Sequence, residues 1–176
     1  MNNEFAEAVR DGRHYLIATD GACKGNPGTG GWGAIIQLKD GTEVVRQKPI
    51  AGQGEVMIST NNQMELTAVI RALEAVAEPL PIVIISDSRY VIDGAKNLPK
   101  WKAKGWRTTN GAVANKELWM VLDQLLETNS VRWVWQRGHN GHYLNGLADE
   151  LSSNAALGLY PHGTKSLKAR HPKWFR

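Results

Sequence analysis

The chain has 176 residues and a mass of 19.4 kDa, which is enough for one domain with a substantial hydrophobic core. With 42% hydrophobic and 22% charged residues its composition is that of an ordinary globular protein, and no apolar stretch is long enough to span a bilayer. The N-terminal residues lack the pattern of a signal peptide and Cys23 is the single cysteine, so we expect a cytoplasmic protein without an intramolecular disulfide or a membrane partner.

Positive charge is concentrated in two segments. Residues 151–176 contain five Lys or Arg and no Asp or Glu, so the rest of the chain has 16 basic and 17 acidic residues and a net charge of −1. A second basic cluster is interleaved with Trp101 and Trp106 and consists of Lys96, Lys100, Lys102, Lys104 and Arg107. Blocks of charge are usually only solvated surface, but basic residues that alternate with indole rings favour nucleic-acid binding.

The first half of the chain predicts three strands and a helix. After an N-terminal extension (1–13), residues 15–19 and 32–38 are predicted to form a hairpin, and residues 42–47 a third strand. In residues 61–78 the apolar residues recur at helical spacing. Asn62 is a suitable N-cap for this helix, and Pro79 and Pro81 follow its end.

The second half alternates between strands and helices. Residues 81–87 are apolar on both faces, which is typical of a strand covered by helices on each side. Helices are predicted near 88–97, 115–127 and 144–156, with a fifth strand at 131–137. The pattern predicts an α/β domain with a mixed five-stranded sheet and helices on both faces. We place this domain at residues 14–160 and a basic C-terminal tail at 161–176.

Four acidic residues fall on four different predicted elements: Asp20, Glu65, Asp87 and Asp149. Each has a simple structural explanation, namely a turn residue, a capping box with Asn62, a helix N-cap and a surface position. If they converge, however, they cannot all stay ionised without a cation. Carboxylate oxygens suit magnesium or manganese, and two such ions can drive phosphodiester hydrolysis. Spacing alone leaves both interpretations open.

Five segments, in this order, closely resemble the bacterial type 1 ribonuclease H family: TDGACKGNPGTGGWGAI, STNNQMELTAVIRALE, ISDSRYVIDG, WKAKGWRT and WVWQRGHNGHYLNGLADELS. The similarity extends from about residue 14 to about residue 156. It implies a ribonuclease H-like fold and a monomeric endonuclease. Such an enzyme hydrolyses the RNA strand of an RNA–DNA hybrid with two Mg²⁺ ions, for which Mn²⁺ can substitute, and leaves 5′-phosphate and 3′-hydroxyl ends.

The resemblance also implies roles for the acidic residues and for one histidine. Asp20 would bridge the two ions, Glu65 and Asp87 would complete one metal site, and Asp149 would complete the other. The catalytic histidine of the family corresponds to His139, which would move a proton or assist product release. His142 lies in the same loop, and spacing alone does not exclude it from this role.

Substrate contacts are implied at two groups of residues. The first group, Asn26, Thr60, Asn61, Asn62 and Asn115, matches family positions that contact the hybrid. The second is a stretch that we call the basic handle (residues 100–107), with Lys100, Trp101, Lys102, Lys104 and Trp106 as contacts. Amide groups suit the wide minor groove with its 2′-hydroxyls. We expect the Gly-rich segment after Asp20 to leave room for a nucleic-acid backbone.

Two positions depart from the family pattern, and two other functions compete with the nuclease. Arg89 stands where a glutamine is common, and Gln37 stands where a basic residue often helps hold a DNA phosphate. Trp133 and Trp135, on one strand face, are predicted to be core residues. A hybrid-binding module without catalysis would lack one of the four carboxylates. An integrase or transposase would carry three acidic residues in other surroundings, together with additional domains.

Overall fold

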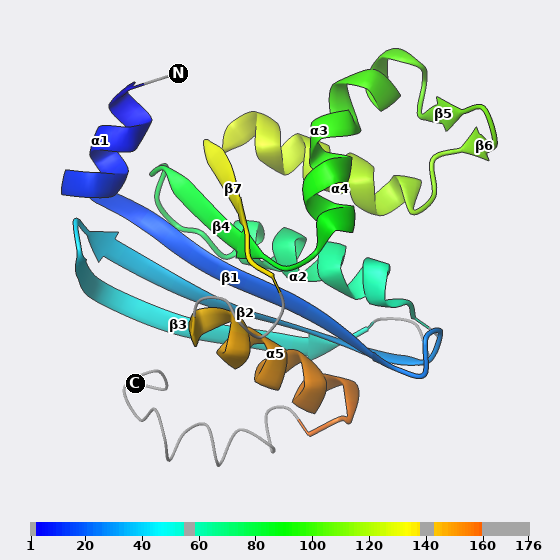
Figure 1. Cartoon of the computed structure of the whole chain (residues 1–176), viewed down its shortest axis with the longest axis horizontal. Helices are drawn as coiled ribbons and strands as arrows, with labels where there is room; N and C mark the ends of the chain where they lie inside the picture. The colour runs from blue at the N-terminus through cyan, green and yellow to red at the C-terminus, as the bar shows by residue number, and fades with distance from the viewer. Residues whose placement is uncertain (1–2, 55–58, 138–142, 160–176) are drawn as a thin grey trace.

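The sheet has five strands in the order β3-β2-β1-β4-β7 (Figure 1). The computed structural model describes residues 3–54, 59–137 and 143–159. The strands are β1 (Arg13–Lys24), β2 (Thr29–Asp40), β3 (Glu43–Gln53), β4 (Ile82–Ser86) and β7 (Val131–Trp135). The first three form an antiparallel meander, and β1, β4 and β7 run parallel to one another. The predicted mixed sheet is confirmed.

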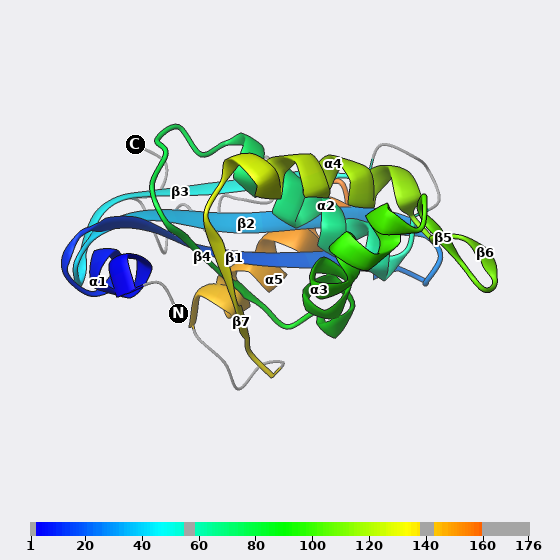
Figure 2. The same cartoon turned by 90° about the horizontal axis from the view of Figure 1, so that it is seen from above.

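The helices cover both faces of this sheet. They are α1 (Asn3–Asp11), α2 (Asn61–Glu74), α3 (Arg89–Ala103), α4 (Lys116–Thr128) and α5 (Tyr143–Ala156). Figure 2 shows α2 and α4 on one side of the sheet and α5 on the other. The larger core cluster lies between the sheet and α2, α3 and α4, and it includes the fully buried Trp119. A smaller cluster under α5 joins Ala18 and Ile35 to the apolar side of that helix.

Several elements are longer than the sequence predicts. Strands β1 and β2 remain paired as far as Lys24 and Thr29, well into the Gly-rich segment that was predicted to be a turn. Helix α3 runs through Pro99 to Ala103, so the basic handle begins inside a helix. A small hairpin of β5 (Arg107–Thr108) and β6 (Gly111–Ala112) follows, which the sequence did not predict because two-residue strands leave no periodic pattern.

Trp133 and Trp135 have different surroundings, although both were predicted to be core residues. Trp133 packs against the larger core, whereas Trp135 is 38% exposed, so the prediction for Trp135 was wrong. Strand β7 is the last strand of the sheet order, and its end lies beside the start of α3. Trp135 is therefore covered by Arg89 of that helix, with the guanidinium 4.0 Å from the ring centroid.

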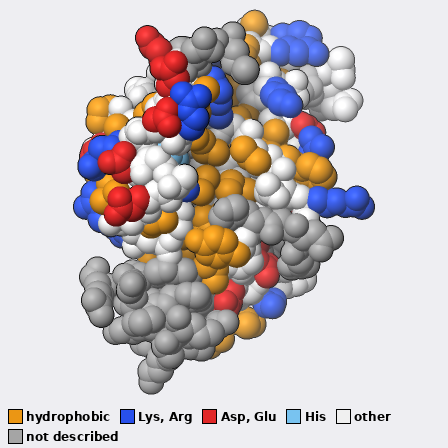
Figure 3. Space-filling view, turned by 60° about the vertical axis from the view of Figure 1, so that its left-hand side comes forward, with side chains coloured by type: hydrophobic (Ala, Val, Ile, Leu, Met, Phe, Trp, Pro, Cys, Tyr) orange, Lys and Arg blue, Asp and Glu red, His pale blue; other side chains and the backbone are white. Residues whose placement is uncertain are grey.

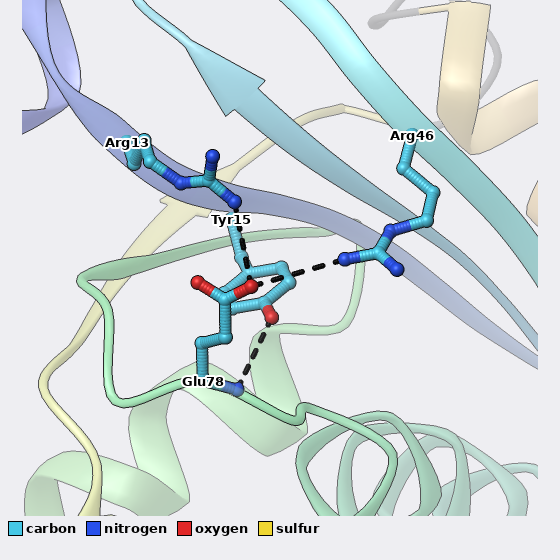
Figure 4. A network of polar contacts seen from close by, with 4 residues as sticks. All are labelled: Arg13, Tyr15, Arg46 and Glu78. Carbon is cyan, nitrogen blue, oxygen red and sulfur yellow. Dashed lines mark hydrogen bonds and ion pairs between the residues drawn. The ribbon is translucent and has the colours of Figure 1, made fainter.

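The loop after α2 is fixed to the sheet by the polar contacts around Glu78 (Figure 4). Its carboxylate lies 3.4 Å from the Arg13 guanidinium on β1 and 3.8 Å from that of Arg46 on β3. Its backbone N–H donates to the Tyr15 hydroxyl at 3.3 Å. These contacts hold the C-terminal end of α2 over the meander, away from the end of the helix that reaches the acidic residues.

The N-terminal extension contains an amphipathic helix that packs against the domain. In α1, Phe5 is only 7% exposed, and the guanidinium of Arg132 on β7 lies 4.2 Å above its ring. Figure 3 shows the molecule with its α1 end turned toward the viewer. Hydrophobic side chains lie across the middle of this face, and charged side chains lie around them. None of the helices in the described ranges is long and apolar enough to cross a membrane.

We predict that Phe5→Ala lowers the free energy of unfolding by about 2–4 kcal/mol, since it removes a buried aromatic side chain and leaves a gap under α1. Urea unfolding followed by circular dichroism measures the change. Glu7→Ala is the matched control, because Glu7 lies on the same helix with an exposed side chain. Equal midpoints for Phe5→Ala and the wild type would show that α1 contributes nothing to the stability of the domain.

Candidate active site

An open acidic cavity of about 430 Å³ lies where β1 and β4 meet the starts of α2 and α3. It is lined by the four carboxylates singled out in the sequence, by Asn61 and Asn62, and by residues 88–90. Oxygen atoms of Asp20, Glu65 and Asp87 lie within 4.8 Å of one another. Asp20 is buried, Glu65 is half-buried and Asp87 is exposed, so the cavity opens to solvent on the side of Asp87.

The start of α2 approaches β1 so closely that only glycine fits between them. A Cβ at Gly21 would lie 2.5 Å from the carbonyl carbon of Met64, and the backbone nitrogen of Glu65 would also obstruct it. Real Cβ atoms do not tolerate such distances from backbone atoms. Glycine after Asp20 therefore lets α2 carry Glu65 close to Asp20 on β1. The expectation that this segment leaves room for nucleic acid is wrong for Gly21, because helix α2 occupies the space.

Helix α5 reaches the other face of the sheet in the same way. A Cβ at Gly33, the partner of Asp20 in the β1–β2 register, would lie 2.7 Å from the Leu151 Cβ and 2.9 Å from the Ala148 carbonyl oxygen. This approach brings Asp149 to the cavity that Asp20 lines. The buried hydroxyl of Ser152 lies 3.4 Å from Asp20 Oδ2 and 2.9 Å from the Asp149 carbonyl oxygen, and so connects the two elements.

Neither Glu65 nor Asp87 caps a helix, so the capping alternative left open by the sequence is wrong for both. The N-cap of α2 is Thr60, whose hydroxyl accepts a hydrogen bond from Gln63 N, while the Gln63 side chain accepts one from Thr60 N. Ser88 caps α3 by accepting from Val91 N at 3.2 Å. Because neighbouring residues satisfy the helix ends, both carboxylates remain directed at the cavity.

Because the carboxylates are crowded and partly buried, they bind protons more tightly than usual and favour a bound cation. Burial, followed by the charge of Asp87, raises the pKa of Asp20 to about 8. Burial and the charges of Asp20 and Asp87 raise the pKa of Glu65 well above its ordinary value. Glu65 Oε2 is buried and has no hydrogen-bond partner among the described residues. An orphaned buried carboxylate oxygen beside two others fits a hard divalent cation, which prefers oxygen ligands.

The predicted amide contacts lie beside this cavity. Asn61 and Asn62 are exposed at the start of α2, and the Asn26 side chain accepts a hydrogen bond from Asn61 N at 3.1 Å. Asn115 lies at the start of α4, and its side chain bonds to both Gln63 and Tyr90. Asn62 was predicted to be the α2 cap, and the structure leaves its side chain on the surface instead.

The residues of the basic handle have different surroundings. Lys100, Lys104 and Arg107 line a hollow of about 210 Å³. Lys102 turns toward α4, where its ammonium lies 2.9 Å from Asp123 and also contacts Glu127. Both tryptophans of the handle, Trp101 and Trp106, are partly buried against the larger core, and Trp101 meets Trp119 edge-on.

Two residues that depart from the family pattern have clear surroundings. Arg89 lines the acidic cavity and stacks on Trp135, whose indole N–H donates to the Asp87 carbonyl oxygen at 3.3 Å. Gln37 is 2% exposed and bonds to Gln47 and to the Tyr143 hydroxyl, so its side chain is not available to a phosphate. His139, His142 and the basic tail at 161–176 lie outside the described residues.

Comparisons with known proteins point to one family. The profile of the RNase H family matches residues 12–157. The chain is 46% identical to a ribonuclease H of Novosphingobium aromaticivorans over 147 residues, or 82% of this chain and 98% of that protein. It is 47% identical to one of Cupriavidus pinatubonensis over 149 residues, or 84% of this chain and 98% of that protein.

Solved structures share the fold. The crystal structure of LC9-RNase H1, described as a type 1 RNase H with the type 2 active-site motif, has a TM-score of 0.73 and 30% identity, over 84% of this chain and 74% of that chain. LC11-RNase H1, solved in complex with an RNA/DNA hybrid, has a TM-score of 0.61 over 82% of this chain and 97% of that chain. At 20% identity, the second comparison supports the fold alone.

We predict that Gly21→Ala destabilises the protein by about 1–3 kcal/mol, because the added methyl pushes α2 away from β1. The same shift should weaken the stabilisation that a divalent cation gives, since it separates Glu65 from Asp20. Thermal unfolding with and without added cation measures both effects. Gly146→Ala is the control, because its Cβ would meet open space on α5 and should stabilise that helix. Equal cation-induced shifts in the Gly21 variant and the wild type would contradict this account.

Proposed function

Because the chain belongs to the ribonuclease H family, we propose that its acidic cavity hydrolyses the RNA strand of RNA–DNA hybrids with two Mg²⁺ ions, leaving 5′-phosphate and 3′-hydroxyl ends. The observation that carries the proposal is the meeting of Asp20, Glu65 and Asp87 within 4.8 Å, with Asp149 lining the same cavity. A hybrid-binding module without catalysis is disfavoured, because all four carboxylates are present and gathered. We further propose that the enzyme acts as a monomer in the cytoplasm.

The burial of each carboxylate suits the part proposed for it. Asp20, the most buried, would hold both ions from the floor of the cavity. Glu65 and Asp87 would complete one site, and Asp149 the other. When bound, two magnesium ions supply an activated water and stabilise the departing 3′-oxygen. Manganese could replace magnesium, because both take carboxylate oxygens. His139 is proposed to move a proton or to assist product release, as the resemblance implies.

The polar residues around the cavity would position the hybrid. Asn26, Thr60, Asn61 and Asn62 would contact the hybrid in its minor groove, where amide and hydroxyl groups suit the 2′-hydroxyls. Asn115 and the basic handle would contact phosphates further along the duplex, which positions the substrate without reading its sequence. The direct test is digestion of end-labelled hybrid, duplex RNA and duplex DNA, first with magnesium and then with EDTA. We expect cleavage of the RNA strand of the hybrid only, and only with magnesium.

We predict that Asp20→Asn reduces cleavage by at least about 10³-fold, since the amide cannot supply the negative charge that holds both ions. Hybrid binding should persist, because the proposed phosphate contacts lie on other elements. Initial rates and fluorescence anisotropy, each measured with the same hybrid, test the two statements. Magnesium-dependent turnover near the wild-type rate would refute the assignment of Asp20 as a metal ligand.

The same substitution should stabilise the metal-free protein. The pKa of Asp20 is raised from 3.8 to about 8 in the folded state, so its contribution to stability is present below pH 3.8 and is lost as the pH rises toward 8. Asp20→Asn removes this loss, and at pH 7 we expect a gain of about 1 kcal/mol or more, or about 2–4 °C in Tm. Scans in EDTA and in magnesium measure it. Magnesium should raise the Tm of the wild type but not that of the variant.

The basic handle should act on binding rather than on chemistry. We predict that replacing Lys100 and Lys104 with Ala raises KM about 5–30-fold with little change in kcat, because phosphate contacts exist in ground and transition states alike. The dependence of binding on salt should also become shallower. Steady-state titrations at two salt concentrations measure both. Lys102→Ala is a useful comparison: since this ammonium is paired with acidic residues of α4, its effect on the salt dependence should be smaller.

A further inference from the structure

We propose that Gln63 is a positioning residue that fixes the starts of α2 and α4 relative to each other, and thereby the spacing between the two sets of amide contacts to the hybrid. The inference rests on the proposed function, and it concerns a residue that neither lines the acidic cavity nor belongs to the basic handle. Gln63 lies one residue after Asn62 on α2, and it faces Asn115 at the start of α4.

The side-chain amide of Gln63 forms one hydrogen bond through its oxygen and another through its nitrogen. Its carbonyl oxygen accepts a hydrogen bond from Thr60 N at 3.0 Å, which closes the capping box of α2. Its NH₂ group donates to Asn115 Oδ1 at 3.2 Å, across the gap to α4. The two contacts require opposite ends of the amide, so they also fix its orientation.

We call the hydrogen bond between Gln63 and Asn115 the bridge. Further hydrogen bonds connect Asn115 to the core. Asn115 Nδ2 donates to the Tyr90 hydroxyl at 2.9 Å, and the same hydroxyl accepts from Trp119 Nε1 at 3.2 Å. Trp119 is fully buried, and Tyr90 also lines the acidic cavity. Asn115 makes no side-chain cap for its own helix and has a left-handed backbone, with φ 58°. Its side chain is committed to the network instead.

Helix capping alone does not account for glutamine at this position. A glutamate would accept the same hydrogen bond from Thr60 N, and its negative charge would in addition favour the first turn of a helix. What glutamine adds is a donor, and that donor is used toward Asn115. Below the bridge, α2 and α4 are separated by a groove of about 440 Å³ that Gln63, Ile70 and Leu118 help to line. Side-chain packing therefore leaves part of this interface open, and the hydrogen bond between Gln63 and Asn115 spans it at the end nearest Asn61 and Asn62.

The consequence for function is a fixed spacing between contacts on two helices. Asn61 and Asn62 would touch the hybrid from α2, and Asn115 from α4. With the bridge intact, these groups form one preorganised surface, which lowers the ordering cost of binding. Without it, Asn115 would keep only its contact with Tyr90. The carboxylates are held by other contacts, so loss of the bridge should act on KM and leave kcat nearly unchanged.

The test measures KM and kcat on one hybrid for Gln63→Leu, Asn115→Ala and the double variant, with Tm for each. We expect Gln63→Leu to raise KM about fivefold, the size typical of one lost hydrogen bond, and to change kcat less than twofold. In the double variant KM should be no higher than in Asn115→Ala alone, because Gln63 acts through Asn115. Multiplicative effects of the two substitutions, or an unchanged KM for Gln63→Leu, would overturn the proposal.

A second variant separates the bridge from the cap. Gln63→Glu keeps the acceptor for Thr60 N and removes only the donor, so we expect KM to rise while Tm stays within about 2 °C of the wild type. Thr67→Glu controls for the added charge, because it places a carboxylate one turn further along the same face of α2. If Gln63→Glu raised KM no more than Thr67→Glu, charge repulsion would explain the result and the bridge would be refuted.

Discussion

The candidate active site depends on two places where a helix backbone lies against the sheet with no room for a Cβ. Gly21 admits the start of α2 on one face, and Gly33 admits α5 on the other. Asp20 precedes Gly21 on β1 and pairs with Gly33 on β2. Because each helix carries one further carboxylate, the separations among the acidic groups are set by backbone contacts, which yield less than flexible side chains do. The glycines therefore set the spacing of the carboxylates, although they contribute no side chain to the cavity.

Gathering the carboxylates in one partly buried site has an electrostatic cost. Burial and the charge of neighbouring carboxylates raise the pKa values of Asp20 and Glu65, and Glu65 Oε2 has no hydrogen-bond partner in the described part of the chain. Here Thr60 and Ser88 take over the helix caps, so Glu65 and Asp87 are left to face the cavity. A divalent cation would relieve the repulsion, and its binding would then stabilise the fold.

The sequence predicted the sheet, its layers and the four carboxylates, but not the contacts that arrange them. Alternation and helical spacing are local signals, and family resemblance identified the acidic residues. The α2 cap was misplaced by two residues, because Thr60 and Asn62 are both good caps and the choice depends on where the helix meets β1. The role of Gly21 was misread, since a close approach between segments far apart in sequence leaves no local pattern. Arg89 on Trp135 was missed for the same reason.

The carboxylates and the proposed substrate contact of Asn115 depend on largely different packing contacts in this fold. Glu65 and Asp149 are placed by the close approach of α2 and α5 to the sheet, whereas Asn115, a proposed substrate contact, is tied through Gln63 to α2 and through Tyr90 to the buried Trp119. Lys102 anchors the basic handle to α4, the helix on which Asn115 stands. The handle and the Asn115 contact therefore share one support. A substitution that moves α4 should change the proposed phosphate contacts at both places. It should leave the spacing of Asp20, Glu65 and Asp149 unchanged, because β1, α2 and α5 carry these carboxylates, and it can reach the acidic cavity through Tyr90, which lines it.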